Sequence, residues 1–230
     1  MNAALAVQEI TIETPDGVRL AGTYAAGPAG GPAALLLHMM PAAKESWSEF
    51  AAVLARRGFA TLAIDLRGHG RSTRGTGGRT LDYRLFTERE HQAKTIDVEA
   101  AAAWLEREHG FGKSRLAAVG ASIGANLAIA FAAAHPEIPA AAALSPGLDY
   151  RGVTTPDKVR NFGPAQGLFL AASEEDELSF RTGRELVRLK PDAVLKEYRG
   201  AGHGTAMFEA QPELMTELAD WLASEFEVME

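Results

Sequence analysis

The pentapeptide at residues 120–124, Gly-Ala-Ser-Ile-Gly, holds the serine best placed for nucleophilic chemistry. It follows the apolar run Leu116–Val119 and opens a segment of helical spacing that begins near Ile123. A G-x-S-x-G turn between a strand and a helix is tight, so the residues two positions before and after the serine must be small. The serine hydroxyl then stands above the sheet, beside free N–H groups of the helix. This context predicts that Ser122 is a nucleophile. The alternatives are a turn in which Ser122 only caps the helix, and a dinucleotide-binding turn, which requires G-x-G-x-x-G.

A serine hydroxyl is a weak nucleophile unless a base lies beside it. His203 is the best candidate, because it follows the last predicted strand and glycines flank it on both sides, which allows its loop to return over the sheet. The alternative is an exposed histidine in a flexible loop. An acid that orients the histidine is expected from the charged run Ser173–Glu177, where we predict Asp176, with Asp149 as the fallback. The other carboxylates of this run are expected to form a solvated turn.

The segments that must position these side chains begin with two alternating stretches, Val7–Glu13 and Val18–Ala25, joined through Pro15-Asp16-Gly17. They predict an antiparallel hairpin. Apolar runs then alternate with segments of helical spacing. The predicted strands are Ala33–His38, Ala60–Asp65, Leu116–Gly120, Ala140–Leu144, Gly167–Ala172 and Val194–Tyr198. The predicted helices are Lys44–Arg57, Thr95–His109, one starting near Ile123, Leu178–Leu189 and Pro212–Phe226.

This alternation predicts an α/β fold. We expect a mostly parallel, doubly wound sheet with helices on both faces and the N-terminal hairpin as an antiparallel edge. No repeat or clear linker interrupts residues 1–230, which are predicted to form a single domain. Ligands of open α/β sheets bind at the carboxyl ends of the strands, so chemistry is expected where the strands stop.

The order of the three candidates, Ser122, Asp176 and His203, is that of the catalytic residues of α/β-hydrolases. The chain resembles this family over nearly its whole length. The further segments that carry the resemblance are Leu36–Pro41, similar to the His-Gly-x-Pro oxyanion strand end, Asp65–Ser72, similar to the D-x-R-G-x-G-x-S loop, and Ser173–Asp176, similar to the G-x-x-D acid turn.

The resemblance implies that Asp176 and His203 complete a triad, and that the backbone N–H groups of Ile123 and Met40 bind the oxyanion. Met39 stands where the family usually has glycine, a departure in the oxyanion loop. The chain is similar to capless or small-cap esterases and to dienelactone-hydrolase-like proteins. Dienelactone hydrolases use a cysteine, which this chain lacks, and Ser122 excludes the aspartate nucleophile of dehalogenases and epoxide hydrolases.

We therefore predict a serine carboxylesterase that cleaves small esters through an acyl-enzyme, without a metal or an organic cofactor. Met39 and Met40 are expected to line an apolar acyl pocket, with a core position for one of them as the alternative. An acyltransferase, a thioesterase or an amidase would use the same triad. A protein of another class, which binds a ligand on a hydrolase scaffold without turnover, is the remaining alternative.

The composition and charge of the chain exclude some classes of binding partner. The chain has 230 residues, no cysteine and a net charge of −7, which excludes a disulfide framework and argues against nucleic acid. Met1–Ile10 lacks the basic start of a signal peptide, and we expect a cytoplasmic protein. Leu116–Ala134 is uncharged over 19 residues but is predicted to be a buried strand and helix rather than a membrane span. The sequence does not predict the oligomeric state.

Two segments are candidates to cover the site. Residues 66–92 are predicted to form a small flap through Leu81, Tyr83, Leu85 and Phe86. The excess of arginine between Arg67 and Glu90 indicates either a solvated loop, which we favour, or a surface for an anionic substrate. Pro146–Gln166 contains three prolines, which exclude a long helix there. So small a cover predicts a preference for short acyl chains.

Overall fold

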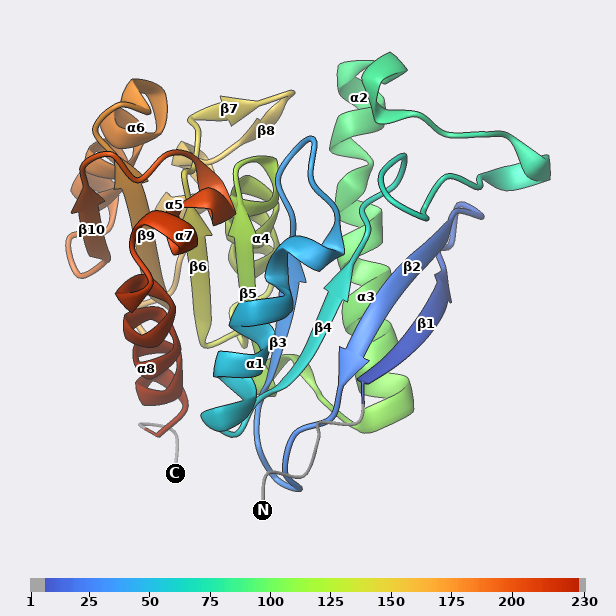
Figure 1. The fold of residues 1–230 in the computed structure, drawn as a ribbon, viewed down its shortest axis with the longest axis horizontal. Helices are drawn as coiled ribbons and strands as arrows, with labels where there is room; N and C mark the ends of the chain where they lie inside the picture. The colour runs from blue at the N-terminus through green and yellow to red at the C-terminus, as the bar shows by residue number, and fades with distance from the viewer. Residues whose placement is uncertain (1–6, 228–230) are drawn as a thin grey trace.

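The apolar runs of the sequence form an eight-stranded sheet in the computed structural model, which describes residues 7–227 (Figure 1). Residues 1–6, which belong to the segment expected not to be a signal peptide, lie outside the described residues. The strands of the sheet are β1 (Val7–Glu13), β2 (Arg19–Ala25), β3 (Ala33–Leu37), β4 (Ala60–Ile64), β5 (Leu116–Ala121), β6 (Ala140–Leu144), β9 (Gly167–Ser173) and β10 (Val194–Tyr198).

The spatial order of the strands is β1-β2-β4-β3-β5-β6-β9-β10. β1 pairs antiparallel with β2, and β2 pairs antiparallel with β4, whereas every other pair in this sheet is parallel. The predicted α/β class, with an antiparallel N-terminal hairpin on a parallel sheet, is confirmed. β4 lies on one side of β3 and β5 lies on the other, so the order in which strands are added to the sheet changes direction at β3. Such a reversal opens a crevice at the carboxyl ends of the two strands.

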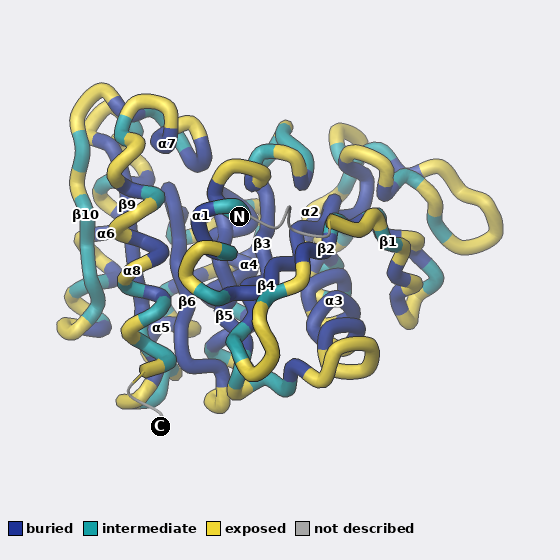
Figure 2. The backbone as a smooth tube through the Cα atoms, turned by 60° about the horizontal axis from the view of Figure 1, so that its bottom comes forward, coloured by how far each residue is buried: buried dark blue, intermediate teal, exposed yellow. Residues whose placement is uncertain are grey.

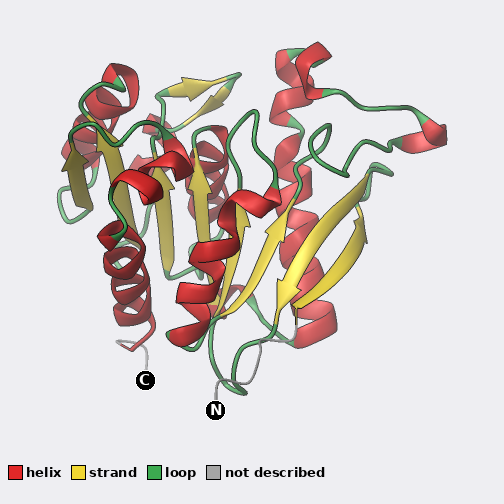
Figure 3. Ribbon diagram, viewed as in Figure 1, coloured by secondary structure: helices red, strands yellow, loops and turns green. Residues whose placement is uncertain are grey.

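Helices cover both faces of the sheet (Figure 3). The longer helices are α1 (Ser48–Arg56), α3 (Lys94–His109), α4 (Ile123–Ala134), α6 (Glu177–Leu189) and α8 (Glu213–Glu227). On one face α1 and α8 pack through Phe50, Leu54 and Leu218. On the other face α3, α4 and α6 bury side chains such as Leu105 and Leu127. β3, β4, β5 and β6 are buried along their whole length between these two cores (Figure 2), which explains their continuous apolar sequence.

The short elements of the fold were not predicted. They are α2 (Glu88–Gln92), α5 (Pro156–Arg160), α7 (Met207–Ala210) and the hairpin of β7 (Asp149–Tyr150) and β8 (Val153–Thr154). Elements of two to five residues are too short to produce a hydrophobic period. The predicted helix at 44–57 is also divided, because its first turn, Lys44–Trp47, is a 3-10 helix and α1 begins only at Ser48.

The uncharged stretch at 116–134 is the buried strand β5 followed by the buried helix α4. Within residues 7–227, no helix is both long and apolar enough to cross a membrane. The segment between Pro146 and Gln166 holds only the β7–β8 hairpin and α5, as its prolines predict.

The segment predicted to form a flap packs away from the sheet centre in this structure (Figure 1). The Thr76 hydroxyl donates a hydrogen bond of 2.6 Å to the backbone oxygen of Asp16, in the turn between β1 and β2. Leu81 is buried in the core, whereas Leu85 is 81% exposed. A flap that closes over the site therefore stays a prediction.

Candidate active site

Ser122 lies between β5 and α4, at the crevice where the chain reverses. Its backbone has φ 54° and ψ −121°, a conformation that non-glycine residues rarely adopt and that marks a strained turn. A side chain at Gly120 would collide with the Gly124 backbone, and one at Gly124 would collide with the backbone oxygen of Leu37. The two glycines are therefore required because α4 begins directly against the ends of β5 and β3.

His203 and Asp176 are in direct contact. The Nδ1 atom of His203 lies 2.6 Å from the Oδ2 atom of Asp176, a distance typical of a charge-assisted hydrogen bond. Asp176 follows β9 and sits immediately before α6, while His203 lies in the loop after β10. Asp149, the fallback acid, is instead occupied in its own hairpin, where its Oδ1 accepts a hydrogen bond from the Gly152 N–H.

The His203 loop lies against the serine turn. A Cβ atom placed on Gly204 would be 3.3 Å from the Cβ of Ala121, the residue before Ser122. The Gly204 N–H donates a 2.8 Å hydrogen bond to Ser145 Oγ at the end of β6. Within residues 7–227, no direct hydrogen bond joins Ser122 to His203. The serine and the histidine–aspartate pair are therefore neighbours at one edge of the sheet.

Glu175 holds the His203 loop from the acid turn. Its two carboxylate oxygens accept hydrogen bonds from the N–H groups of Gly200 (2.9 Å) and Gly202 (2.7 Å). These bonds, that of Gly202 first, lower the pKa of Glu175 to about 2. Ser173 adds a third tie, because its Oγ accepts a bond from Ala201 N–H at 3.0 Å. Glu175 is exposed and lies in a turn, as predicted for the carboxylates beside Asp176, but it also holds the histidine loop.

The end of β3 lies beside the first turn of α4. The register pairs Leu37 with Gly120, which places the following residues, His38 to Met40, next to the serine turn. Ile123 is the first residue of α4, so its N–H has no acceptor within the helix. The Met39 side chain lies against Gly204, where an added Cβ would collide with its sulfur. The structure thus places the backbone of both expected oxyanion donors and the Met39 side chain beside the serine turn, whereas the Met40 sulfur lies 3.7 Å from Lys94 Nζ.

His38 has a structural role. Its Nε2 accepts a 3.0 Å hydrogen bond from the Leu66 N–H, which ties the end of β3 to the end of β4. Its Nδ1 lies 2.8 Å from the backbone oxygen of Met39. Burial lowers the pKa of His38 to about 4, so the ring is neutral at pH 7.

Tyr150 is a site residue that the sequence did not indicate. Its hydroxyl lies 3.0 Å from Ser179 Oγ and close to Ser122. Burial raises its pKa, and the nearby hydroxyls of Ser179 and Ser122 act in the opposite direction. The tyrosine comes from the two-residue strand β7, which leaves no pattern in the sequence.

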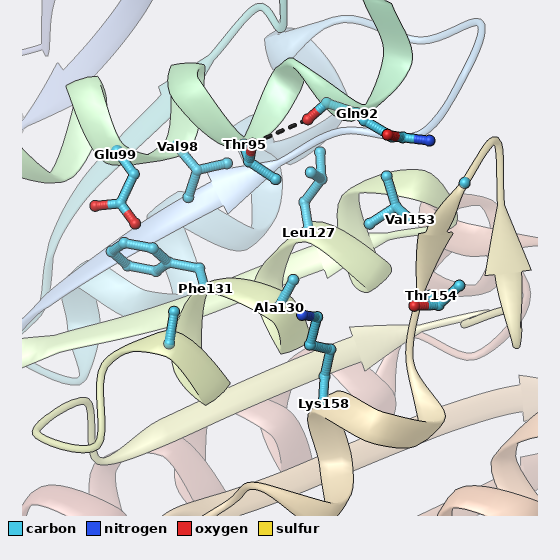
Figure 4. Close-up of a pocket in the computed structure, with 12 residues that line it drawn as sticks. Gln92, Thr95, Val98, Glu99, Leu127, Ala130, Phe131, Val153, Thr154 and Lys158 are labelled. Carbon is cyan, nitrogen blue, oxygen red and sulfur yellow. Dashed lines mark hydrogen bonds between the residues drawn. The ribbon is translucent and has the colours of Figure 1, made fainter. Parts of the chain in front are cut away.

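A separate cavity of about 360 Å³ lies between α3 and α4 (Figure 4). Apolar side chains, among them Val98, Leu127 and Phe131, form part of its wall, and Lys158 lies at its edge. Gly152 and Thr154 of the β7–β8 hairpin also line it, so this hairpin contributes both to the cavity and to the serine site. Ser122 is not among the lining residues.

The arginine-rich loop consists largely of paired side chains. Arg67 is buried and bonds to Asp97 and Asp16, so the prediction of a solvated loop is wrong for this residue. Arg79 and Arg84 are exposed and pair with local carboxylates. These contacts leave little support for a surface that binds an anionic substrate through the arginines.

Comparison with known proteins agrees with this architecture. A family model described as alpha/beta hydrolase fold matches residues 32–166. Two uncharacterized proteins of Mycobacterium tuberculosis are 32% identical over 131 residues, which make up 56% of this chain and 42% of theirs. The chain thus spans less than half the length of these curated relatives.

Solved structures extend the similarity to nearly the whole chain. An esterase of Pyrococcus furiosus has a TM-score of 0.76 at 18% identity, covering 96% of this chain and 92% of its own. A dienelactone hydrolase of Anabaena variabilis has a TM-score of 0.68 at 20% identity, covering 96% and 97%. At such identities the similarity concerns the fold. Since the family model matches more than half of its residues, the chain belongs to the α/β hydrolase fold family.

Proposed function

We propose that this protein is a serine carboxylesterase with Ser122 as nucleophile, His203 as base and Asp176 as the acid that orients the histidine. The observation that carries the proposal is the 2.6 Å contact between His203 Nδ1 and Asp176 Oδ2, beside a strained serine turn. A histidine held through Nδ1 keeps Nε2 free to take a proton from a serine. The similarity in fold to proteins described as esterases supports the same reaction class.

In the proposed reaction, the Ser122 Oγ attacks the ester carbonyl carbon while its proton passes to His203 Nε2. The N–H groups of Ile123 and Met40 bind the oxyanion of the tetrahedral intermediate. His203 then returns the proton to the leaving alcohol as the ester bond breaks. Water, deprotonated by His203, attacks the acyl-enzyme, and His203 returns this proton to Ser122 Oγ as the acyl bond breaks and the acid is released. Asp176 holds the imidazole tautomer and stabilises the imidazolium in both half-reactions.

A fluorophosphonate probe tests the nucleophile, because it labels only an activated serine. We expect Ser122 to be labelled, and we expect Ser122→Ala to abolish labelling and lower kcat on 4-nitrophenyl acetate by at least about 10⁴-fold. Ser224→Ala is the matched control, since Ser224 is exposed on α8 and bonds only to the Trp221 backbone oxygen. It should leave both readouts unchanged.

The outcomes separate the candidate functions. Hydrolysis that survives in Ser122→Ala would point to a different nucleophile. A wild-type protein that neither reacts with the probe nor turns over esters would favour a ligand-binding protein on this scaffold. Labelling with a preference for transfer to an added alcohol over hydrolysis would indicate an acyltransferase.

A further inference from the structure

Lys94, the first residue of α3, is a charged side chain with no exposed surface. Its Nζ atom lies 3.0 Å from His91 Nδ1, 3.4 Å from His69 Nε2 and 3.7 Å from Met40 Sδ. An ammonium group only donates hydrogen bonds, so all three atoms must act as acceptors. Lysine is almost never fully buried without an acidic partner.

This lysine lacks such a partner. None of the carboxylates in the described part of the chain forms a salt bridge with Lys94, and Asp97, one turn further along α3, is bonded to Arg67. Burial lowers the pKa of His69 to about 2 and that of His91 to about 4, so both rings are neutral at pH 7. The charge of Lys94 is therefore surrounded by neutral acceptors.

Burial also lowers the pKa of Lys94 to about 8. The neighbouring titratable and charged groups come from every element that surrounds it: His38 after β3, Arg67 and His69 after β4, His91 from α2, Asp97 from α3 and Arg151 from the β7–β8 hairpin. Only Asp97 acts to raise the pKa of Lys94, whereas Arg151 and Arg67 act to lower it. A buried, unpaired charge destabilises a fold, so its presence at one edge of a site calls for a functional reason.

The position of Lys94 supplies one. Its contact with Met40 reaches the end of the segment that follows β3, and the Met40 N–H is one of the two donors assigned to the oxyanion. The same segment is fixed at its start by the bonds of His38 to Met39 and Leu66. The ring of His38 also meets that of His69 at 4.8 Å. The segment from His38 to Met40 is thus held at its start by the bonds of His38 and at its end by the contact of Lys94 with Met40.

We propose that Lys94 is a positioning residue for ester hydrolysis, which holds Met40 in place and sets a positive charge behind the oxyanion loop. This role rests on the proposed function. A fixed charge of this kind stabilises the negative charge that develops in the transition state more than it stabilises the neutral ester. Its loss should therefore lower kcat and leave KM nearly unchanged.

The role has a direct consequence for pH dependence. The contribution of Lys94 is present while the ammonium is protonated and is lost as the pH rises through about 8. The histidine base must be neutral, which makes the rate rise with pH in the acid range. Together the two requirements give a bell-shaped kcat profile, in which the decline at alkaline pH follows the deprotonation of Lys94.

The experiment measures kcat and KM for 4-nitrophenyl acetate from about pH 5 to pH 10, with the rate of Ser122→Ala subtracted as background. We expect Lys94→Met to lower kcat about tenfold at pH 7, less than the 10²–10³-fold typical of a direct oxyanion donor, and to abolish the alkaline decline. The matched control is Lys190→Met. Lys190 directly follows α6 and is also buried, but it pairs with Asp192. It should keep the bell shape.

Thermal unfolding separates this role from a purely structural one. A lysine needed for folding would lower Tm when replaced, whereas removing an unpaired buried charge should leave Tm at pH 7 unchanged or higher. A group whose folded pKa is lowered from 10.5 to about 8 destabilises the fold below pH 8, and this penalty fades as the pH rises toward 10.5. The Tm advantage of Lys94→Met should fade over the same range.

Each outcome decides a separate question. A wild-type kcat that stays flat to pH 10, or a Lys94→Met variant that keeps the alkaline decline, would overturn the role of Lys94 while Ser122-dependent hydrolysis remains intact. The wild-type profile keeps this test valid even if the variant does not fold. The absence of any Ser122-dependent hydrolysis would overturn the esterase proposal and this role with it.

Discussion

At the scale of single residues, the arrangement of Asp176 and His203 is the most informative contact in the molecule. The carboxylate is held before α6 and the imidazole in a loop after β10, so the pair forms only when the ends of β9 and β10 lie side by side. Their parallel pairing places Tyr198 opposite Ser173 and brings the two following loops together. The proposed acid and base are thus positioned by the same pair of strands.

The choice between the two candidate acids is open to a direct test. Asp176→Asn should lower kcat/KM by about 10⁴-fold, because an amide leaves the imidazole in the wrong tautomer. Asp149→Asn should have little effect, since the new side chain keeps an oxygen that can accept from the Gly152 N–H. Steady-state hydrolysis near neutral pH measures both. A larger loss in Asp149→Asn would assign the acid to the segment after β6.

At the scale of elements, the loops at the strand ends are fixed by side chains that belong to other loops. The N–H groups of the His203 loop donate hydrogen bonds to Glu175, Ser173 and Ser145, which come from the ends of β9 and β6. The N–H groups of Gly200, Ala201, Gly202 and Gly204, which flank His203, are thereby all satisfied. A glycine-rich loop without these ties would sample many conformations.

Glu175→Gln should therefore lower kcat about tenfold through a less ordered His203 loop, with little change in Tm because the side chain is exposed. The neighbouring Glu174→Gln is the control, since Glu174 pairs only with the exposed Arg199. The sign of the pH effect follows from the lowered pKa of Glu175: the loop contacts persist above the ordinary glutamate value and are lost as the pH falls toward about 2. Equal activity of the two variants would contradict this role.

At the scale of the whole molecule, Arg67 ties the antiparallel edge to the helices behind the sheet. It donates to Asp97 of α3 at 2.8 Å and to Asp16 of the β1–β2 turn at 2.7 Å. Asp97 is fully buried, and burial raises its pKa to about 6 against the opposing effect of Arg67. Removal of the Arg67 side chain would leave the buried Asp97 carboxylate without an oppositely charged partner, with only the backbone N–H of residue 67 still donating to it.

We expect Arg67→Met to lower the free energy of unfolding by about 3–5 kcal/mol at pH 7, as measured by urea denaturation. Adding Asp97→Leu should recover part of this loss, because the unpaired charge is then absent. Arg84→Met, which removes an exposed pair, should change stability by less than about 0.5 kcal/mol. A single variant as stable as the wild type would mean that the pair is dispensable.

The size of the cover sets the expected substrate range. The segment after β6 holds only a small hairpin and a helix of five residues, and residues 74–81 pack on the β1–β2 turn. So small a cover is expected to leave little apolar wall for a long acyl chain, and each further methylene adds about 0.8 kcal/mol only where such a wall receives it. We expect a panel of 4-nitrophenyl esters to show a maximum of kcat/KM at about two to six acyl carbons. A preference for long chains, or a rate jump at the onset of emulsion, would require a closing flap.

The sequence by itself determined the architecture and the serine turn. Continuous apolar runs between amphipathic helices permit little but a parallel sheet covered on both faces, because such strands must be buried. The serine turn is equally local: Gly120 and Gly124 are the only residue type that fits between β5, α4 and β3. The sequence also predicted the expected acid and base, because Asp176 and His203 each follow a predicted strand.

Only the tertiary structure decided which polar side chains support that site. Glu175 and Asp176 are neighbours in one charged run, yet one holds the backbone of the histidine loop and the other contacts the imidazole. Tyr150 reaches Ser122 from a strand of two residues, and Lys94 reaches Met40 across 54 positions. These contacts depend on the paths of separate loops and on the burial of each group. Neither is encoded in the periodicity or spacing of a single segment, so folding must bring the partners together before their roles can be read.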